Sequence, residues 1–301
     1  MALLGLGTYR CRDVSAAAQA AIAAGLPLID TAPVYAHGTA QTHLGRHLIN
    51  HSQVRVSSKV GHMTRSQAAA ARVAGVVTVQ QAERGHCLTP DYIDHQLAQN
   101  LAELRRSRLD LLYLHNPEHD IHTDRQHLMH QIRDAFEACE RAAHQGRITG
   151  YGIATWSGFS SSAFTVPELL AAARQAAGGP DHHLAAIQLP VNLVQLAPLS
   201  QSLKGGGPVA QASHAGLEVW ASAPLNGGEL TTLVSQELAE LIGPGLSPSG
   251  AALTVVASTP GITGALLSAS TTAHLQDALV TFQRPPLQPE HLREICRVLR
   301  T

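Results

Sequence analysis

Short apolar runs alternate with longer stretches of mixed apolar and polar residues along most of the chain. Continuous apolar runs of a few residues are typical of strands that are buried on both faces of a parallel sheet. The pattern therefore predicts buried strands at residues 3–6, 26–29, 54–58, 109–114, 150–154, 184–189, 217–221 and 262–266.

The stretches between these runs are rich in alanine and leucine and predict helices. Thr89 before Pro90 and Ser247 before Pro248 are typical helix starts, because a hydroxyl caps the free backbone N–H groups and proline fits the first helical position. Gly146 is a typical stop signal just beyond a helix. The predicted helices cover residues 15–24, 39–49, 90–106, 125–145, 166–176, 208–215 and 248–258.

Eight strands that alternate with helices are compatible with an open doubly wound sheet or with a closed barrel. The open sheet commonly carries a GxGxxG phosphate loop between its first strand and first helix. Here residues 5–10 read GLGTYR, which lacks the third glycine and is not followed directly by a helix. The pattern thus favours an α/β fold of the (β/α)8 TIM-barrel type, and 301 residues fit a single such domain over residues 1–301.

A long insertion after the third strand, residues 61–87, interrupts the alternation. It contains an alanine-rich piece at residues 67–74 and a possible strand at residues 76–79. Long segments on the strand-to-helix side of a barrel are typical of lids and binding loops, so we expect that role here. The glycines at residues 205–207 are compatible with a flexible connector or a phosphate cradle, and their composition favours the connector.

Charge and cysteine content narrow the class of partner. The 21 basic and 22 acidic side chains nearly cancel and form no basic block, which argues against nucleic acid and against an anionic membrane surface. Four widely separated cysteines and the absence of a signal-peptide pattern are typical of a reduced, cytoplasmic protein. We therefore expect a small-molecule partner, with the oligomeric state left open.

Polar groups stand at the carboxyl ends of successive predicted strands, where barrel enzymes place their reacting groups. Asp30 and Lys59 each end an apolar run, and pairing them with each other would offset most of the cost of burying two charges. Tyr35 follows in the loop after Asp30, and His115 ends the fourth strand. An ammonium beside the tyrosine is expected to lower the pKa of its hydroxyl, which would make Tyr35 a proton donor to a developing alkoxide.

Each of these residues also has a purely structural interpretation. A carboxylate at a strand end often caps the next helix, a lysine often forms a structural ion pair, and a single histidine is usually only hydrogen-bonded. Four such groups at successive strand ends favour a functional site.

The segments that contain these residues resemble conserved motifs of the aldo-keto reductase family in family order over nearly the whole chain. The matching segments are GLGTY at residues 5–9, DTAPVYAHG at residues 30–38, SSK at residues 57–59, LDLLYLH at residues 109–115, GRITGYGI at residues 146–153, IQLPVN at residues 187–192 and PLNGG at residues 224–228.

The resemblance implies a role for each polar group at the strand ends. Tyr35 is similar to the general acid of the family, Lys59 to the partner that lowers its pKa, and Asp30 to the residue that holds that lysine. His115 resembles the donor that orients the substrate carbonyl, and Gln188 the residue that holds the nicotinamide carboxamide. The implied cofactor is NADP, extended across the barrel mouth.

Departures from the family pattern lie on the cofactor side. Ala154 and Thr155 stand where the family has Ser-Asn, so that only Thr155 retains a side chain able to bind the carboxamide. The strand-seven segment lacks the aromatic ring that often stacks under the nicotinamide. The usual N-terminal hairpin is also missing, since the predicted first strand begins at residue 3.

The resemblance places the remaining cofactor contacts after the seventh and eighth strands. Residues 267–272 contain no lysine or arginine for the 2′-phosphate of NADPH, so binding is expected to be weak and NAD is possible. The expected contacts are Ser222, Pro224, Leu225, Gly227, Ser268, Ser270 and Thr271.

Three further residues are candidates for the substrate pocket. Trp156 lies in the loop after the fifth strand, and His86 and Cys87 end the insertion. A dense group of possible ligands follows the fourth strand, but its spacing matches no standard ligand pattern and we expect no metal there. Its members are His115, Glu118, His119, Asp120 and His122.

Three functions are compatible with the sequence. The first is an NAD(P)H-dependent oxidoreductase that reduces an aldehyde or ketone, or oxidises the matching alcohol, with Tyr35 as general acid. The second is a non-redox acid–base enzyme, such as a dehydratase, isomerase or lyase, which has lost normal use of the nicotinamide. The third is a binding or regulatory protein that has kept only the scaffold.

Overall fold

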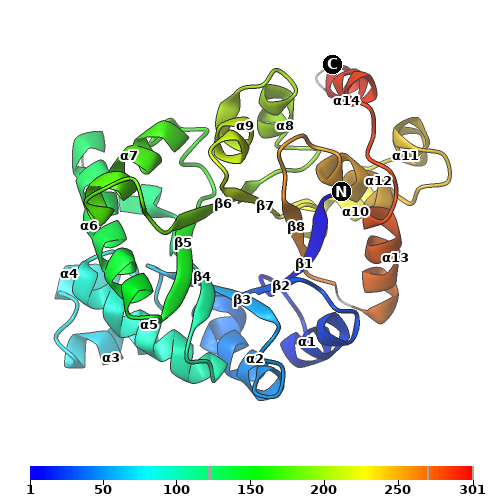
Figure 1. The fold of residues 1–301 in the computed structure, drawn as a ribbon. Coiled ribbons are helices and arrows are strands. Elements are labelled where there is room, and N and C mark those ends of the chain that lie inside the picture. Colours follow the sequence, from blue (N-terminus) through cyan, green and yellow to red (C-terminus); the bar gives the residue numbers. More distant parts are fainter. Residues whose placement is uncertain (121–123, 270, 300–301) are drawn as a thin grey trace.

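Parallel strands close into a barrel around which the helices are arranged (Figure 1). The computed structural model describes residues 1–120, 124–269 and 271–299. Neighbouring strands follow the order of the sequence, and the ring closes by parallel pairing of β1 with β8. The strands are β1 (Leu3–Gly7), β2 (Leu28–Asp30), β3 (Arg55–Val60), β4 (Leu109–His115), β5 (Ile148–Ala154), β6 (Leu184–Pro190), β7 (Glu218–Ser222) and β8 (Gly264–Leu267). The predicted (β/α)8 barrel is confirmed.

The strands bury both of their faces, which explains their continuous apolar sequences. In β4, Leu112 and Leu114 join the large core cluster that the strands share with the surrounding helices. The alternate residues Leu111 and Tyr113 pack instead with Ala186 and other barrel residues in a separate cluster. The side chains thus alternate between the inside of the barrel and the helical layer.

Several helices of the outer layer begin at hydroxyl residues, and the predicted cap Ser247 is found, whereas the predicted cap Thr89 makes no side-chain hydrogen bond to α5. Ser247 accepts a hydrogen bond from the backbone N–H of Gly250, and Thr165 forms a capping box with Glu168. The layer comprises α1 (Val14–Ala23), α2 (Ala40–Leu48), α5 (Pro90–Leu104), α6 (Arg125–His144), α7 (Val166–Ala177), α8 (Ala197–Ser202), α9 (Gly207–His214), α10 (Leu230–Leu233), α11 (Gln236–Ile242), α12 (Pro248–Ala257), α13 (Thr272–Phe282) and α14 (Pro289–Val298). None of the described helices is both long and apolar enough to cross a bilayer.

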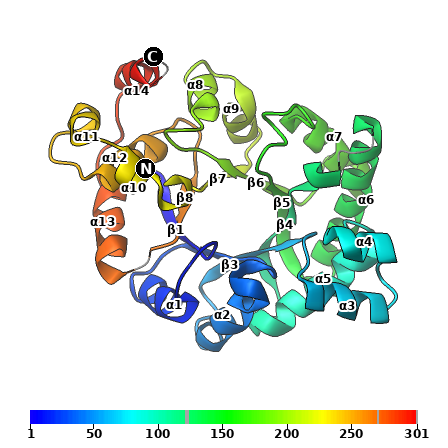
Figure 2. The same cartoon turned by 180° about the vertical axis from the view of Figure 1, so that it is seen from behind.

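The insertion between β3 and α5 folds into two short helices, α3 (Arg65–Val73) and α4 (Val79–Arg84). They lie together beside α5 at the periphery of the barrel (Figure 2). Their apolar side chains pack against Tyr92 of α5. The strand predicted at residues 76–79 is wrong, because Thr78 caps the start of α4 and forms a capping box with Gln81.

Backbone pairing closes the base of the insertion at the carboxyl end of β3. His62 and His86 form an antiparallel bridge, and the backbone N–H of Cys87 donates to the carbonyl of Gly61 at 3.0 Å. The insertion therefore leaves and rejoins the barrel at one point of its mouth, beside the end of β4.

Candidate active site

A buried ion pair lies at the carboxyl ends of β2 and β3. Lys59 Nζ donates to Asp30 Oδ2 at 2.6 Å, and both side chains are almost fully buried. The ammonium also donates to the carbonyl of Thr31 at 2.9 Å. Burial lowers the pKa of Lys59, while the charge and hydrogen bond of Asp30 oppose that shift. The pairing predicted from the sequence is therefore present.

Asp30 uses its second oxygen to connect this pair to two further strands. Oδ1 accepts from Ser57 Oγ at 2.7 Å and from Gln188 Nε2 at 3.0 Å. Gln188 is buried, and its amide nitrogen points to Asp30. The residue assigned to the nicotinamide carboxamide thus belongs to the network that holds the carboxylate.

Tyr35 lies above the ion pair, in the short 3-10 helix η1 (Tyr35–Gly38) after β2. Lys59 Nζ is 4.9 Å from the centroid of the tyrosine ring, and the ring of Tyr9 packs against it at 5.3 Å between centroids. The residues Ala36 and His37 that follow have positive φ angles of 48° and 55°, so the backbone turns sharply just after the tyrosine.

The pKa of Tyr35 shifts in the direction opposite to that expected from the sequence. Burial raises the pKa of the phenol well above its usual value, and the negative charge of Asp30 adds to the shift. The ammonium of Lys59 donates to Asp30 and Thr31 and lies over the ring face. Its positive charge therefore does not outweigh the effects of burial and of Asp30 on the pKa of Tyr35. The expected lowering is therefore not found, and the hydroxyl remains protonated at neutral pH.

His115 ends β4 and faces Tyr35 edge-on, with 5.9 Å between ring centroids and an interplanar angle of 84°. Burial lowers the pKa of His115 well below its usual value, and the charge of Lys59 adds to the shift. The imidazole is therefore neutral at pH 7 and can act as a hydrogen-bond donor through one nitrogen.

Other imidazoles pack around His115 at the mouth. The ring of His62 lies 4.8 Å from that of His115, 4.6 Å from that of His86 and 4.9 Å from that of His119. His86 Nε2 also lies 2.9 Å from the carbonyl oxygen of His115. His86 thus lies beside His115, and so does His62, which was not among the residues predicted from the sequence.

Gly61 makes the approach of His86 possible. Its φ angle is +128°, and a Cβ there would lie 2.9 Å from His86 Nε2. Cys87 does not join the imidazoles, because it is buried among insertion residues and its sulfur lies 3.1 Å from Thr89 Oγ1.

Glu118 organises the loop that follows β5. Its Oε1 atom accepts from the Thr155 hydroxyl at 2.7 Å and from the backbone N–H groups of Trp156, Ser157 and Gly158 at 3.0, 2.9 and 3.2 Å. The Thr155 hydroxyl also accepts from the N–H of Gly158 at 2.7 Å. The hydroxyl assigned to the cofactor is therefore used within the loop, while the indole of Trp156 remains 48% exposed.

The loop after β7 approaches the loop after β1. Its residues Ser222, Leu225 and Gly227 are at least partly exposed, whereas Pro224 is buried. The Arg10 guanidinium lies over Gly227, with Nη1 2.5 Å from where a Cβ would stand, and 5.4 Å from the centroid of the Tyr9 ring. Arg10 is thus a cation at the mouth that was not among the predicted site residues, although it directly follows the GLGTY segment.

Side chains after β8 are partly used in local contacts. Ser268 hydrogen-bonds to Cys11, and Thr271 caps α13 by accepting from the N–H of His274 at 3.1 Å. The predicted contact Ser270 lies outside the described residues.

The family profile described as Aldo/keto reductase family matches residues 3–300, which is nearly the whole chain. The chain belongs to the aldo/keto reductase family. No protein with a curated description matches the chain in sequence.

Solved structures of aldo/keto reductases share this fold at low sequence identity. An enzyme from Klebsiella pneumoniae in complex with NADPH is 20% identical, with a TM-score of 0.69 and coverage of 99% of this chain and 90% of that chain. A second Klebsiella pneumoniae structure, with NADP and acetate, is also 20% identical, with a TM-score of 0.68 and coverage of 99% and 91%. A glycerol dehydrogenase from Gluconobacter oxydans is 20% identical, with a TM-score of 0.70 and coverage of 98% and 90%.

Proposed function

We propose that this aldo/keto reductase is a nicotinamide-dependent oxidoreductase that reduces an aldehyde or ketone, or oxidises the matching alcohol. The observation that carries the proposal is the stack of Tyr35 over the buried Lys59–Asp30 pair, with neutral His115 edge-on to the tyrosine. One acid, one cation beside it and one neutral donor are the groups that carbonyl reduction needs.

Tyr35 is the proton donor in this proposal. Its raised pKa keeps the hydroxyl protonated, so the acid form is available at neutral pH. When the proton moves to the carbonyl oxygen, the ring becomes a phenolate, and the ammonium of Lys59 at 4.9 Å from its centroid then stabilises the new negative charge. The phenolate regains its proton from water after the alcohol leaves.

Neutral His115 orients the carbonyl by donating one N–H to its oxygen. Its Nδ1 atom is buried and has no partner among the described residues. An imidazole that stays neutral cannot compete with Tyr35 as an acid, so the two groups have separate tasks.

Several residues of the mouth fit a dinucleotide. Gly227 is exposed and the Arg10 guanidinium packs against it, so a side chain at this position would collide with the guanidinium. A cation over exposed backbone suits a pyrophosphate. When bound, the nicotinamide would supply the hydride, and the similar structures that contain NADPH and NADP support this assignment.

Within that cofactor assignment we propose NADP, with NAD as the alternative. Residues 267–272 offer serine and threonine but no cation to a 2′-phosphate, so the preference between the two should be small.

The second candidate is non-redox acid–base catalysis on the same four residues. It is favoured by the inward hydrogen bonds of Gln188 and Thr155, which leave the expected carboxamide contacts occupied. Dehydration or isomerisation would need Tyr35 and His115 but no hydride source.

Titration of NADPH and NADH into the purified protein distinguishes the two candidates. Quenching of tryptophan fluorescence at micromolar concentrations of either dinucleotide is the expected result, and Arg10→Gln should weaken both about equally. The reductase proposal fails if neither dinucleotide binds at millimolar concentration, and non-redox substrates would then be assayed with wild type and Tyr35→Phe.

A further inference from the structure

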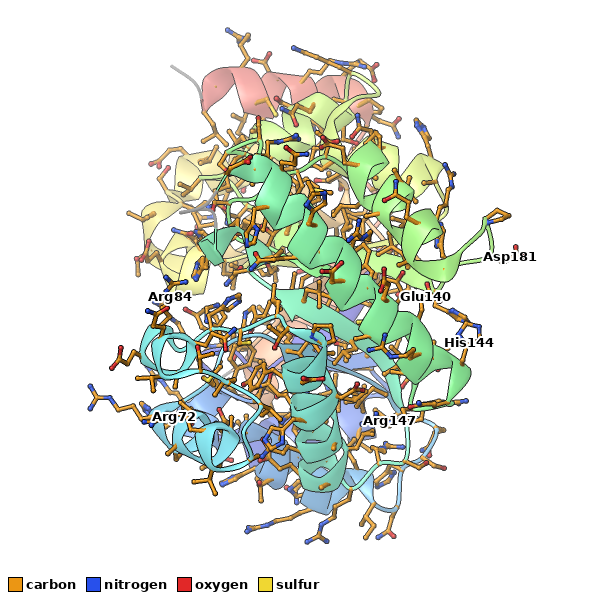
Figure 3. All side chains as sticks on the ribbon, turned by 90° about the vertical axis from the view of Figure 1, so that its left-hand side faces the viewer. Arg72, Arg84, Glu140, His144, Arg147 and Asp181 are labelled. Atoms are coloured by element: carbon orange, nitrogen blue, oxygen red, sulfur yellow. The ribbon has the colours of Figure 1, made fainter. Side chains whose placement is uncertain are left out.

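A group of possible metal ligands lies at the opposite end of the barrel from the mouth. Glu140 and His144 stand one turn apart at the carboxyl end of α6, and His183 directly precedes β6, where that strand begins. Figure 3 shows Glu140 and His144 at the end of α6, on the same side of the molecule as Asp181. Among the described residues, these three offer ligand atoms that lie within 4.8 Å of one another.

Glu140 is held rigidly in this group. The residue is only 3% exposed, and its Oε1 atom accepts from the Tyr151 hydroxyl at 2.7 Å and from the N–H of His183 at 2.8 Å. Its Oε2 atom lies 2.6 Å from His183 Nδ1. A carboxylate fixed in this way loses little conformational freedom when it binds an ion.

His144 uses one of its two ring nitrogens in a hydrogen bond to the backbone. Its Nδ1 atom lies 2.8 Å from the backbone carbonyl of Glu140, and since a carbonyl can only accept, Nδ1 carries the proton. The Nε2 atom then has a free lone pair, which is the form that binds metals. The residue is exposed, so an ion can reach it from water.

The two imidazoles have a suitable separation. Their ring centroids are 5.2 Å apart at an interplanar angle of 76°. With metal–nitrogen distances of about 2.0–2.1 Å and tetrahedral angles, two imidazoles on one ion have centroids roughly 5 Å apart.

The cation Arg147 lies on this side of the molecule and does not exclude a metal. Arg147 donates to Asp94 Oδ1 at 3.2 Å, so its charge is partly compensated. Asp181 adds an exposed negative charge beside His183 in the sequence.

We propose that Glu140, His144 and His183 bind a divalent transition-metal ion of the Zn²⁺ type. The ion displaces the proton between His183 and Glu140 Oε2, and that proton is released to solvent. Two imidazoles and one carboxylate favour Zn²⁺ over Ca²⁺ or Mg²⁺, which prefer oxygen ligands. The bound ion ties the end of α6 to the start of β6, far from the reacting groups.

Calorimetric titration of ZnCl₂ into chelator-treated, untagged protein at pH 7.5 tests this site. We expect one equivalent to bind with micromolar affinity. The melting temperature should rise with Zn²⁺ and should not rise with Mg²⁺.

His144→Gln is the decisive variant, because it removes an exposed ligand and leaves the hydrogen bonds of Glu140 with Tyr151 and His183 in place. The affinity of this variant for the one tightly bound Zn²⁺ ion should be at least tenfold weaker than that of wild type. His214→Gln, which changes another exposed histidine in the last turn of a helix, is the matched control and should bind as wild type. The proposal is overturned if wild type binds no Zn²⁺ at millimolar concentration, or if His144→Gln retains wild-type binding. Neither result depends on whether a dinucleotide binds at the mouth.

Discussion

Two opposite charges act on Tyr35, and their balance depends on distances of a few ångströms. Asp30 raises the pKa of the phenol, while Lys59 lies over the ring and hydrogen-bonds to that carboxylate. The ion pair is nearly neutral as a unit, so burial decides the direction of the shift. The neutral phenol is the stable form in the resting site, so in the proposed reduction Tyr35 acts as the acid.

Tyr35→Phe isolates that role. The substitution keeps the ring that packs against Tyr9 and His115 and removes only the hydroxyl. We expect the rate of the chemical step to fall by about 10²–10⁴, with dinucleotide affinity nearly unchanged. Single-turnover kinetics measure the step and fluorescence titration measures the affinity. A variant with wild-type turnover would show that another group donates the proton.

At the scale of single elements, the sequence predicted the strands and the polar residues at their ends, because both follow from the local pattern of apolar and polar residues. All eight strands were predicted, because barrel strands buried on both faces give continuous apolar runs. The strand-end rule also brought Asp30, Lys59 and His115 into one site. The helices α3 and α4 were not predicted, although Thr64 with Gln67 and Thr78 with Gln81 form capping boxes. The helices α8, α10, α11 and α14 also lie outside the predicted ranges.

Other features required the folded chain. The hydrogen bonds between Glu118 and the loop after β5 join residues nearly 40 positions apart in the sequence, so no local sequence pattern predicts them. The direction of the Tyr35 pKa shift depends on burial, which the order of residues does not give.

The loop after β5 should depend on Glu118. In Glu118→Ala the N–H groups of Trp156, Ser157 and Gly158 lose their shared acceptor, and each partner left buried costs about 1–3 kcal/mol. We expect faster hydrogen exchange at these three amides. Glu137→Ala, which removes an exposed carboxylate of α6, is the control and should leave their exchange unchanged. Equal protection in both variants would mean that the loop is held by other contacts.

The packing of α2 on α5 should depend on Gly45. A Cβ at this position would collide with the backbone of Glu103 and Leu104, so Gly45→Ala forces the helices apart. We expect a loss of about 1–3 kcal/mol in the free energy of unfolding, measured by urea denaturation. Gly179→Ala is the matched control, since nothing lies within 4 Å of its Cβ position and its φ is not positive. The close approach would be disproved if the two variants unfolded alike.

At the scale of the whole molecule, all strands run in the same direction, so the two ends of the barrel differ chemically. Asp30, Lys59 and His115 lie at the carboxyl ends of strands, while Glu140 and His183 lie at the opposite end. A change at one end can therefore be tested without altering the other.

The stability of the whole molecule should depend on pH through His115. The pKa of His115 is depressed in the folded chain, whereas in the unfolded chain it is about 6.5. Below pH 6.5 the unfolded state binds a proton that the folded state does not, so stability is complete above about pH 6.5 and falls as the pH drops further. The slope contributed by one such group is about 1.4 kcal/mol per pH unit.

Urea denaturation of wild type and His115→Gln from pH 7.5 to pH 5 measures this contribution. The variant should lose less stability over that range, because the other titrating groups are common to both proteins. Parallel curves would mean that His115 takes up its proton equally in both states.

The contact between His86 and the carbonyl of His115 couples the insertion to the last residue of β4. Protein engineers often treat a surface insertion as a replaceable cassette that can be exchanged for one from another enzyme. Here a cassette without a residue equivalent to His86 would release the backbone of β4 at its last residue, and a residue larger than Gly61 would prevent the contact from re-forming. Exchange of residues 61–87 would therefore alter turnover together with substrate choice, and a transplant that preserves turnover must keep both positions.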